Sequence, residues 1–241
     1  MNFWIIESQA FGNAKTLRNL NSSRFGKYVE IHFDDKPVIV GAFVSHYLLE
    51  KTRICSQSPG DRNYHVFYRM CKGSIPGLSA ELKPTDATKF NYLNQSSLEE
   101  PDIDDGKGFD WMDNAMNDVG ITLQQKSDIY RIVALVLHLG NIEFAGNKNS
   151  GAHIPSEFKP VLNDVALLMG VQPDIIQAAL TSRIMTVQKN AKNRRNSSCK
   201  VKFTPEQAAA GRDALAKSIY SKLFDFIVSC VNQVFSFRMF V

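Results

Sequence analysis

Polar and apolar residues follow patterns along the chain that predict its main secondary-structure elements. Residues 27–33 alternate polar and apolar side chains, which is typical of a half-buried strand. Residues 34–37 read as a turn and 38–44 as a returning strand, so we expect a β-hairpin. Helices are predicted at 62–71 and 126–139. The second of these is apolar nearly all round, which predicts burial on several sides.

The strongest helix signal lies near the end of the sequence. Thr204, Pro205 and Gln207 supply an N-cap hydroxyl, a proline at the first helical position and a reciprocating amide. Apolar residues then recur at three- and four-residue steps and predict one buried stripe: Leu215, Ile219, Leu223, Ile227, Val231 and Val234. We therefore expect one long helix from residue 205 to about residue 234.

Between these elements the sequence predicts loops and one further strand. Residues 74–108 are rich in Pro, Gly, Ser and Asp, which favours a loop or an insertion. Residues 99–113 hold seven acidic residues. Their spacing does not match a calcium-binding EF-hand loop, so we interpret them as a solvated surface insertion. Gly140 is expected to end the second helix, and residues 141–144 to start a strand.

Composition narrows the class of protein without identifying it. The chain has 241 residues, 44% hydrophobic and 22% charged, which is ordinary for a globular protein, and we treat it as one contiguous unit. A net charge of +4 is too weak by itself to indicate nucleic-acid binding. The cysteines are widely spaced without a C-x-x-C pair, which favours reduced thiols. We expect no signal peptide, no membrane span and a cytoplasmic location.

Polar residues that suit a phosphate and its cation are concentrated at 19–27. The 241 residues contain no G-x-x-x-x-G-K-[ST] loop, and the nearest sequence, G-N-A-K-T at 12–16, has its Lys-Thr pair two residues late. Residues 19–27 combine two amides, two hydroxyls and a guanidinium. Ser can ligate Mg²⁺, Asn can donate to phosphate oxygens, and Arg offers a bidentate fork. From pattern alone, a polar turn before a strand explains these residues better.

A resemblance to a known family changes this balance. Residues 10–30, with N-L-N-S-S-R-F-G at 19–26, closely resemble the switch I region of myosin motor domains. Further matching blocks follow in family order: Y-L-L-E-K-T-R at 47–53, R-N-Y-H-V-F-Y at 62–68, L-H-L-G-N-I at 137–142 and D-A-L-A-K at 213–217. Residues 223–233 are most similar to class VI, the myosins that move toward the pointed end of actin filaments.

The resemblance implies an α/β fold, part of a P-loop NTPase motor domain. Residues 1–55 would hold switch I and a few strands of the central mixed sheet. Residues 56–241 would form the mainly helical upper actin-binding region, with the acidic insertion and a basic actin-facing loop. ATP and Mg²⁺ would be the cofactors of the complete motor domain, and the protein would belong to the actin cytoskeleton.

The resemblance also implies a role for each residue of the loop. Asn19 and Asn21 would contact the nucleotide, Ser22 would position the attacking water, and Ser23 would ligate Mg²⁺. Arg24 would pair with a glutamate of switch II, whose D-x-x-G-F-E pattern is not among the 241 residues. The similar D-G-K-G-F-D at 105–110 lies in a turn-rich acidic segment and is not expected to be switch II. We expect these residues alone not to hydrolyse ATP at a motor's rate.

A second biased segment lies between residues 175 and 205, where basic residues occur without any acid. The resemblance identifies it as the surface loop that contacts filamentous actin, through Arg183, Lys189, Lys192, Arg194, Arg195 and Lys200. Ser197 occupies the regulatory position of this loop, sixteen residues before Asp213. Two arginines precede it, as at a basophilic kinase site. Phosphorylation would add about −1.5 to −2 charges to the basic loop.

Three interpretations of function remain open. The first is part of an actin-based motor that couples ATP hydrolysis to movement, with calmodulin or light chains bound only through parts not present in these residues. The second is a short, non-catalytic actin-binding module regulated at Ser197. The third is binding of nucleic acid or another polyanion by the basic loop. We rank it last, because no aromatic residues are interleaved for base stacking, and expect no nucleic-acid partner.

Overall fold

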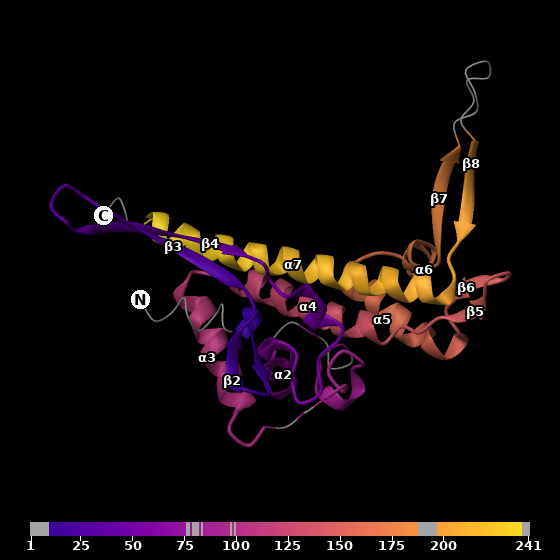
Figure 1. The fold of residues 1–241 in the computed structure, drawn as a ribbon, viewed down its shortest axis with the longest axis horizontal. Helices are drawn as coiled ribbons and strands as arrows, with labels where there is room; N and C mark the ends of the chain where they lie inside the picture. The colour runs from indigo at the N-terminus through magenta and orange to yellow at the C-terminus, as the bar shows by residue number, and fades with distance from the viewer. Residues whose placement is uncertain are drawn as a thin grey trace, which may run out of the picture. The chain divides into compact units, whose positions relative to one another are not determined.

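The chain divides into two units. The computed structural model describes residues 10–75, 78, 82, 84–96, 98, 100–187 and 197–237. The first unit is Met1–Leu137 with Lys217–Val241, and the second is His138–Ala216. The strands of the described residues form four separate two-stranded antiparallel sheets, set among helices (Figure 1). The expected mixture of helices and strands is confirmed.

Two short strands carry the predicted switch I residues in the first unit. Strand β1 (Asn13–Thr16) pairs antiparallel with β2 (Asn19–Ser23). Residues 19–23 are therefore a strand themselves, where pattern alone had favoured a turn. An isolated bridge joins Ala14 to Tyr64, the residue before helix α2 (His65–Lys72). The pair β1–β2 is thus attached directly to the start of α2.

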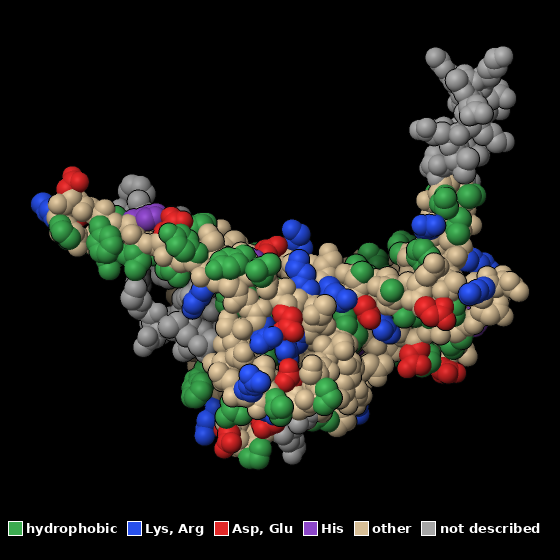
Figure 2. Space-filling view, viewed as in Figure 1, with side chains coloured by type: hydrophobic (Ala, Val, Ile, Leu, Met, Phe, Trp, Pro, Cys, Tyr) green, Lys and Arg blue, Asp and Glu red, His purple; other side chains and the backbone are tan. Residues whose placement is uncertain are grey.

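The predicted β-hairpin is present as β3 (Gly26–Phe33) and β4 (Ile39–Tyr47). The expectation that its first strand is half-buried was wrong. All of β3 after Gly26 is exposed, including the apolar Tyr28 and Phe33. Figure 2 shows apolar side chains along the hairpin, which extends away from the rest of the first unit in Figure 1. Alternation alone does not bury a strand when, among the described residues, no second layer covers it.

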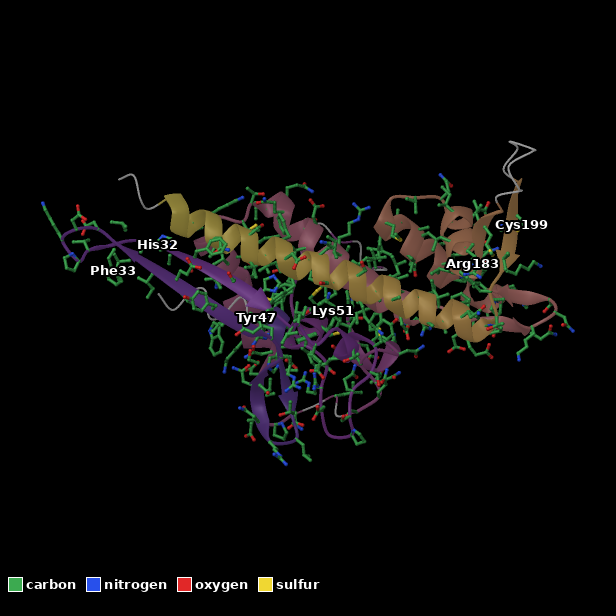
Figure 3. The ribbon with its side chains drawn as sticks, turned by 45° about the horizontal axis from the view of Figure 1, so that its top comes forward. His32, Phe33, Tyr47, Lys51, Arg183 and Cys199 are labelled. Carbon is green, nitrogen blue, oxygen red and sulfur yellow. The ribbon has the colours of Figure 1, made fainter. Side chains whose placement is uncertain are left out.

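The hairpin is fixed near its base by helix α7 (Pro205–Phe237). The Val44 amide donates to Asn232 Oδ1 at 2.8 Å, and Asn232 Nδ2 donates to the Val44 carbonyl at 2.9 Å. Tyr47 lies at this end, while His32 and Phe33 lie toward the far end (Figure 3). One asparagine therefore satisfies both backbone groups of a strand residue.

The acidic segment 99–113 is not a solvated insertion. Helix α3 (Asp105–Asp118) begins inside it, after Asp104 caps the helix by accepting from Lys107 N at 3.0 Å. Phe109 and Met112 are buried, so this part of the segment is an amphipathic helix with one side in the core. The D-G-K-G-F-D sequence at 105–110 forms the first turns of this helix and is not a loop after a strand.

The other helices of the first unit include α4 (Leu123–Gly140) and the 3₁₀ turns η1 (Lys51–Ile54) and η2 (Ala87–Lys89). Residues 138–140 of α4 belong to the second unit. Helix α4 confirms the predicted helix and starts three residues earlier. Its middle is almost wholly buried, as its apolar surface predicts.

Helix α7 confirms the long predicted helix and its capping box. Thr204 N donates to Gln207 Oε1 at 3.0 Å, and Gln207 N donates to Thr204 Oγ1 at 3.3 Å. The buried stripe is broader than predicted, because the fully buried Tyr220 and Phe224 lie at its centre. Ile219, a predicted stripe residue, instead lines an open apolar groove of about 430 Å³ between α4 and α7.

The second unit is a run of short elements. They are β5 (Ala145–Asn147), β6 (Gly151–His153), η3 (Ser156–Phe158), α5 (Lys159–Met169), α6 (Pro173–Thr181), β7 (Ser182–Val187) and β8 (Ser197–Lys202). The strand predicted to start at residues 141–144 was wrong. The amides of Asn141 and Ile142 donate to the carbonyls of His138 and Leu139, so the helix closes with a turn before β5 begins.

In the described part of the chain, no helix is both long enough and apolar enough to cross a bilayer.

Candidate functional site

The predicted site residues lie on β2 and just after it. Because side chains alternate along a strand, Asn19, Asn21 and Ser23 lie on one face, and all three are exposed. Ser22 and Arg24 are partly buried, and Arg24 Nη1 donates to Ser22 Oγ at 3.2 Å. The strand therefore presents two amides and a hydroxyl outward and keeps the guanidinium beside the second hydroxyl.

Internal hydrogen bonds decide which groups of this cluster remain for a ligand. Asn19 Oδ1 accepts from Asn21 N at 2.8 Å, which leaves the Asn19 NH₂ group as a donor. Ser22 Oγ already accepts from Arg24, so its own proton is available to donate. Ser23 Oγ donates to the Phe25 carbonyl at 3.0 Å, which leaves the oxygen lone pairs for a cation. These groups fit a phosphate and Mg²⁺.

A cation here would need few protein ligands. Among the described residues, no three His, Cys, Asp or Glu side chains gather at a metal site. Mg²⁺ is commonly held by one or two protein oxygens together with phosphate oxygens and waters. The Ser23 hydroxyl fits that pattern.

The structure adds Glu50, which the sequence prediction missed. Glu50 Oε2 accepts from Arg24 Nε at 2.6 Å and from Arg53 Nε at 2.8 Å. The buried Arg53 also donates to Asp61 Oδ2 at 3.0 Å. Glu50 lies in the block at 47–53, where an acid precedes a base by three residues. That spacing predicts the ion pair between Glu50 and Arg53, but it does not predict the contact with Arg24, which is distant in sequence.

The pKa of Glu50 gives a pH-dependent prediction. Burial acts to raise this pKa, but hydrogen bonds from Arg24 and Arg53 outweigh it and lower the pKa below its usual value of 4.5. A lowered folded pKa means that the stabilisation is present above the unfolded pKa and is lost as the pH falls through the folded pKa.

We therefore expect Glu50→Gln to destabilise the protein most above about pH 5, and progressively less as the pH falls below about 4. Urea unfolding across this pH range measures the difference between the variant and the parent. Glu157→Gln, at an exposed glutamate of η3, is the matched control and should show no such trend. A difference for Glu50→Gln that is constant with pH would contradict the role given to its charge.

The residues that follow β2 are held in place by Gly12, just before β1, and by helix α7. Arg24 N donates to the Gly12 carbonyl at 2.8 Å, and the Phe25 ring covers Gly12 so closely that a Cβ there would lie 2.4 Å from it. The same ring packs edge-on against Phe224 of α7, with centroids 5.0 Å apart. Gly12 is thus needed for close approach. Nearby, Lys15 donates to the Gly60 carbonyl and pairs with Glu100, so residues 12–16 do not form a phosphate loop.

Two of the predicted actin-contact residues, Arg183 and Lys200, are described, and they lie in the second unit on a β-hairpin. The basic segment was expected to be a loop, but Arg183 lies on β7 and Lys200 on β8, both exposed. Figure 3 shows Arg183 and Cys199 on this hairpin. Ser197 is the first residue of β8 and pairs with Val187 in the backbone register. The other predicted contacts lie outside the described residues: Lys189, Lys192, Arg194 and Arg195.

Known proteins are similar to this chain over nearly its whole length. Residues 5–239 match the family described as "Myosin head (motor domain)". Mouse "Unconventional myosin-VI" is 43% identical over 95% of this chain and 20% of its own length. "Myosin-K heavy chain" of Dictyostelium discoideum is 44% identical over 95% of this chain and 26% of its own. "Myosin-13" of Arabidopsis thaliana is 44% identical over 93% of this chain and 15% of its own. The chain thus spans about a fifth of the length of the myosin-VI relative.

Proposed function

Because this chain belongs to the myosin head (motor domain) family, with class VI myosins among its relatives as the sequence predicted, we propose that it is part of an actin-based motor. Residues 19–24 would recognise the phosphates of Mg·ATP. The supporting observation is the way hydrogen bonds within the chain leave donors on Asn19 and Ser22 and lone pairs on Ser23. Phosphate oxygens are acceptors only and need such donors, and a hard cation needs oxygen lone pairs.

Each side chain then has a distinct task. Asn19 and Asn21 donate to phosphate oxygens, and Ser22 directs its hydroxyl toward the attacking water. Ser23 would ligate Mg²⁺, which would neutralise phosphate charge. Glu50 accepts from Arg24 Nε and Ser22 from one N–H of Nη1, so within the described residues Nη2 and the second N–H of Nη1 are left for a switch II carboxylate.

The fold assignment of this region is also proposed. Residues 1–55 would contribute strands to the central sheet of a P-loop NTPase, and residues 56–241 would form the mainly helical upper region. The exposed apolar side chains of β3 and β4 support this, because a pair of strands with Tyr28, Phe33 and Phe43 exposed suits a larger packed sheet.

Titration with a fluorescent ATP analogue tests the site. For the 241-residue chain we expect weak binding that Mg²⁺ strengthens, and Ser23→Ala should remove most of that strengthening, about tenfold in affinity. Ser218→Ala, at an exposed serine of α7, is the matched control. Equal binding with and without Mg²⁺, or an unchanged Ser23→Ala variant, would argue against the proposal. Turnover of ATP at a motor's rate by this chain would refute the expectation that it cannot hydrolyse ATP alone.

Filamentous actin is the proposed partner of the β7–β8 hairpin. Arg183 and Lys200 are exposed on it and carry the charge that an acidic filament attracts. We expect a combined Arg183→Glu and Lys200→Glu change to reduce co-sedimentation with actin several-fold at low salt. Lys148→Glu, on an exposed turn of the same unit, should have little effect. Equal binding of the parent chain to DNA would favour the polyanion alternative, and pelleting without nucleotide recognition would favour the non-catalytic module.

A further inference from the structure

Two buried side chains converge on the amide of Asn21 from inside the protein. Asn13 Nδ2 donates to Asn21 Oδ1 at 3.0 Å, and His65 Nε2 lies 3.2 Å from the same oxygen. Asn13 is 6% exposed and His65 3%, whereas Asn21 is exposed. The two come from β1 and from the first residue of α2, which are fixed to each other through the Ala14–Tyr64 bridge. The inner side of the Asn21 amide is thus a built site.

The hydrogen-bonding options of His65 decide which way this amide faces. Burial, with the nearby charges of Arg69 and Arg62, lowers the pKa of His65 to about 3, so the ring is neutral and carries one N–H. His65 Nδ1 is buried without a partner among the described residues. If Nδ1 carried the proton, an N–H donor would be buried unpaired. That costs more than a lone pair without a donor.

The proton therefore belongs on Nε2, where it can be donated only if Asn21 turns its oxygen inward. In the opposite orientation, the Asn21 NH₂ group would have to donate to Nε2, and the ring proton would be left on the unpaired Nδ1. The Asn13 amide would then also have to reverse, because two NH₂ groups cannot pair. The observed contacts favour Oδ1 inward and Nδ2 outward.

We propose that His65, together with Asn13, is a positioning residue that locks the Asn21 amide with its NH₂ group facing outward. The exposed face of β2 then presents amide donors from both Asn19 and Asn21, and phosphate oxygens are acceptors only. An unlocked amide would present its oxygen to the phosphate part of the time, which is repulsive. This step rests on the proposed phosphate recognition, but the amide orientation exists without any ligand.

Nuclear magnetic resonance of the ligand-free chain tests the orientation directly. The chain has five histidines, so His65→Gln identifies the His65 signals in a ¹⁵N-histidine-labelled sample. We expect the Nε2–H tautomer, with no change of protonation between pH 8 and 5, and Asn21 Nδ2 protons that exchange readily with water, because the NH₂ group faces outward. The Nδ1–H tautomer, or Asn21 Nδ2 protons that are protected from exchange with water, overturns the proposal.

A titration with magnesium pyrophosphate then tests its consequence. His65→Phe keeps an aromatic ring but removes the donor, and should weaken binding about tenfold. His65→Gln places an amide donor near the original Nε2 and should recover most of that affinity. His153→Phe, at an exposed histidine of β6, is the matched control.

The two measurements separate the two claims. Equal weakening by His65→Gln and His65→Phe would show that a donor at this position does not restore binding, and it overturns the positioning role. Absence of any pyrophosphate-induced change at residues 19–26 overturns the proposed function. The ligand-free spectra decide the amide orientation in either case.

Discussion

Replacing Arg62 with Met is expected to lower the free energy of unfolding by about 3–5 kcal/mol, because it leaves a buried carboxylate without its partner. The Arg62 side chain is fully buried, donates to Asp105 Oδ2 at 2.6 Å, and lies over the Tyr68 ring with its guanidinium carbon 3.7 Å from the centroid. Burial already raises the pKa of Asp105, even though Arg62 and Arg69 act to lower it. Chemical denaturation at pH 7 measures the loss.

Two further results would separate charge from packing at Arg62. A carboxyl group with a raised folded pKa is favoured in its protonated form, so the loss should shrink as the pH is lowered toward 4. Adding Asp105→Leu should recover part of the stability, because the stranded charge is gone. Arg18→Met, at an exposed turn residue, should change stability by less than about 0.5 kcal/mol. If the double variant were as unstable as Arg62→Met, the ion pair would not be the cause.

Replacing Tyr220 with Ala is expected to cost about 3–5 kcal/mol through the cavity it leaves. The ring is fully buried, with the centroids of Tyr64 and Phe67 each 5.3 Å away. Its hydroxyl donates to the Phe11 carbonyl at 2.9 Å, next to Gly12, which accepts from Arg24 N. The variant should therefore also accelerate hydrogen exchange at the Arg24 amide, measured by mass spectrometry.

The matched variants distinguish the ring from its hydroxyl. Tyr220→Phe leaves one buried carbonyl without its donor and should cost about 1–3 kcal/mol. Phe226→Ala removes a more exposed aromatic residue from the same helix and should cost only about 1 kcal/mol. Unchanged exchange at Arg24 in Tyr220→Ala would show that α7 does not hold the loop.

Local signals predicted α2, α4 and α7, because the information for these helices is local, whereas α3, α5 and α6 were not predicted. The capping box at Thr204 and Gln207 formed as its spacing indicates. Periodicity failed where tertiary contacts decide the outcome. The acidic residues of 99–113 look solvated in sequence, yet Phe109 and Met112 at helical spacing bury one side of α3. Conversely, the alternation in β3 predicts burial, but burial needs a covering layer that periodicity cannot supply.

The candidate site was predicted as a set of residues but not as a network. Family resemblance located Asn19, Ser22, Ser23 and Arg24, and these roles stay predictions. Glu50 and His65 were missed as functional residues, because each acts on a side chain from a distant part of the sequence. Neither spacing nor composition encodes that an amide must face outward or that one carboxylate serves two guanidinium groups.

The exposed β3–β4 hairpin favours self-association of this chain in solution. In a two-stranded sheet both strands are edge strands, and each offers a row of backbone groups that another copy can pair with. The exposed apolar residues Val29, Ile31 and Ile39 lie on these two strands. Self-association would mask ligand binding and inflate apparent stability. Protein concentration is therefore an experimental variable in its own right, and titrations repeated at tenfold dilution should give the same constants.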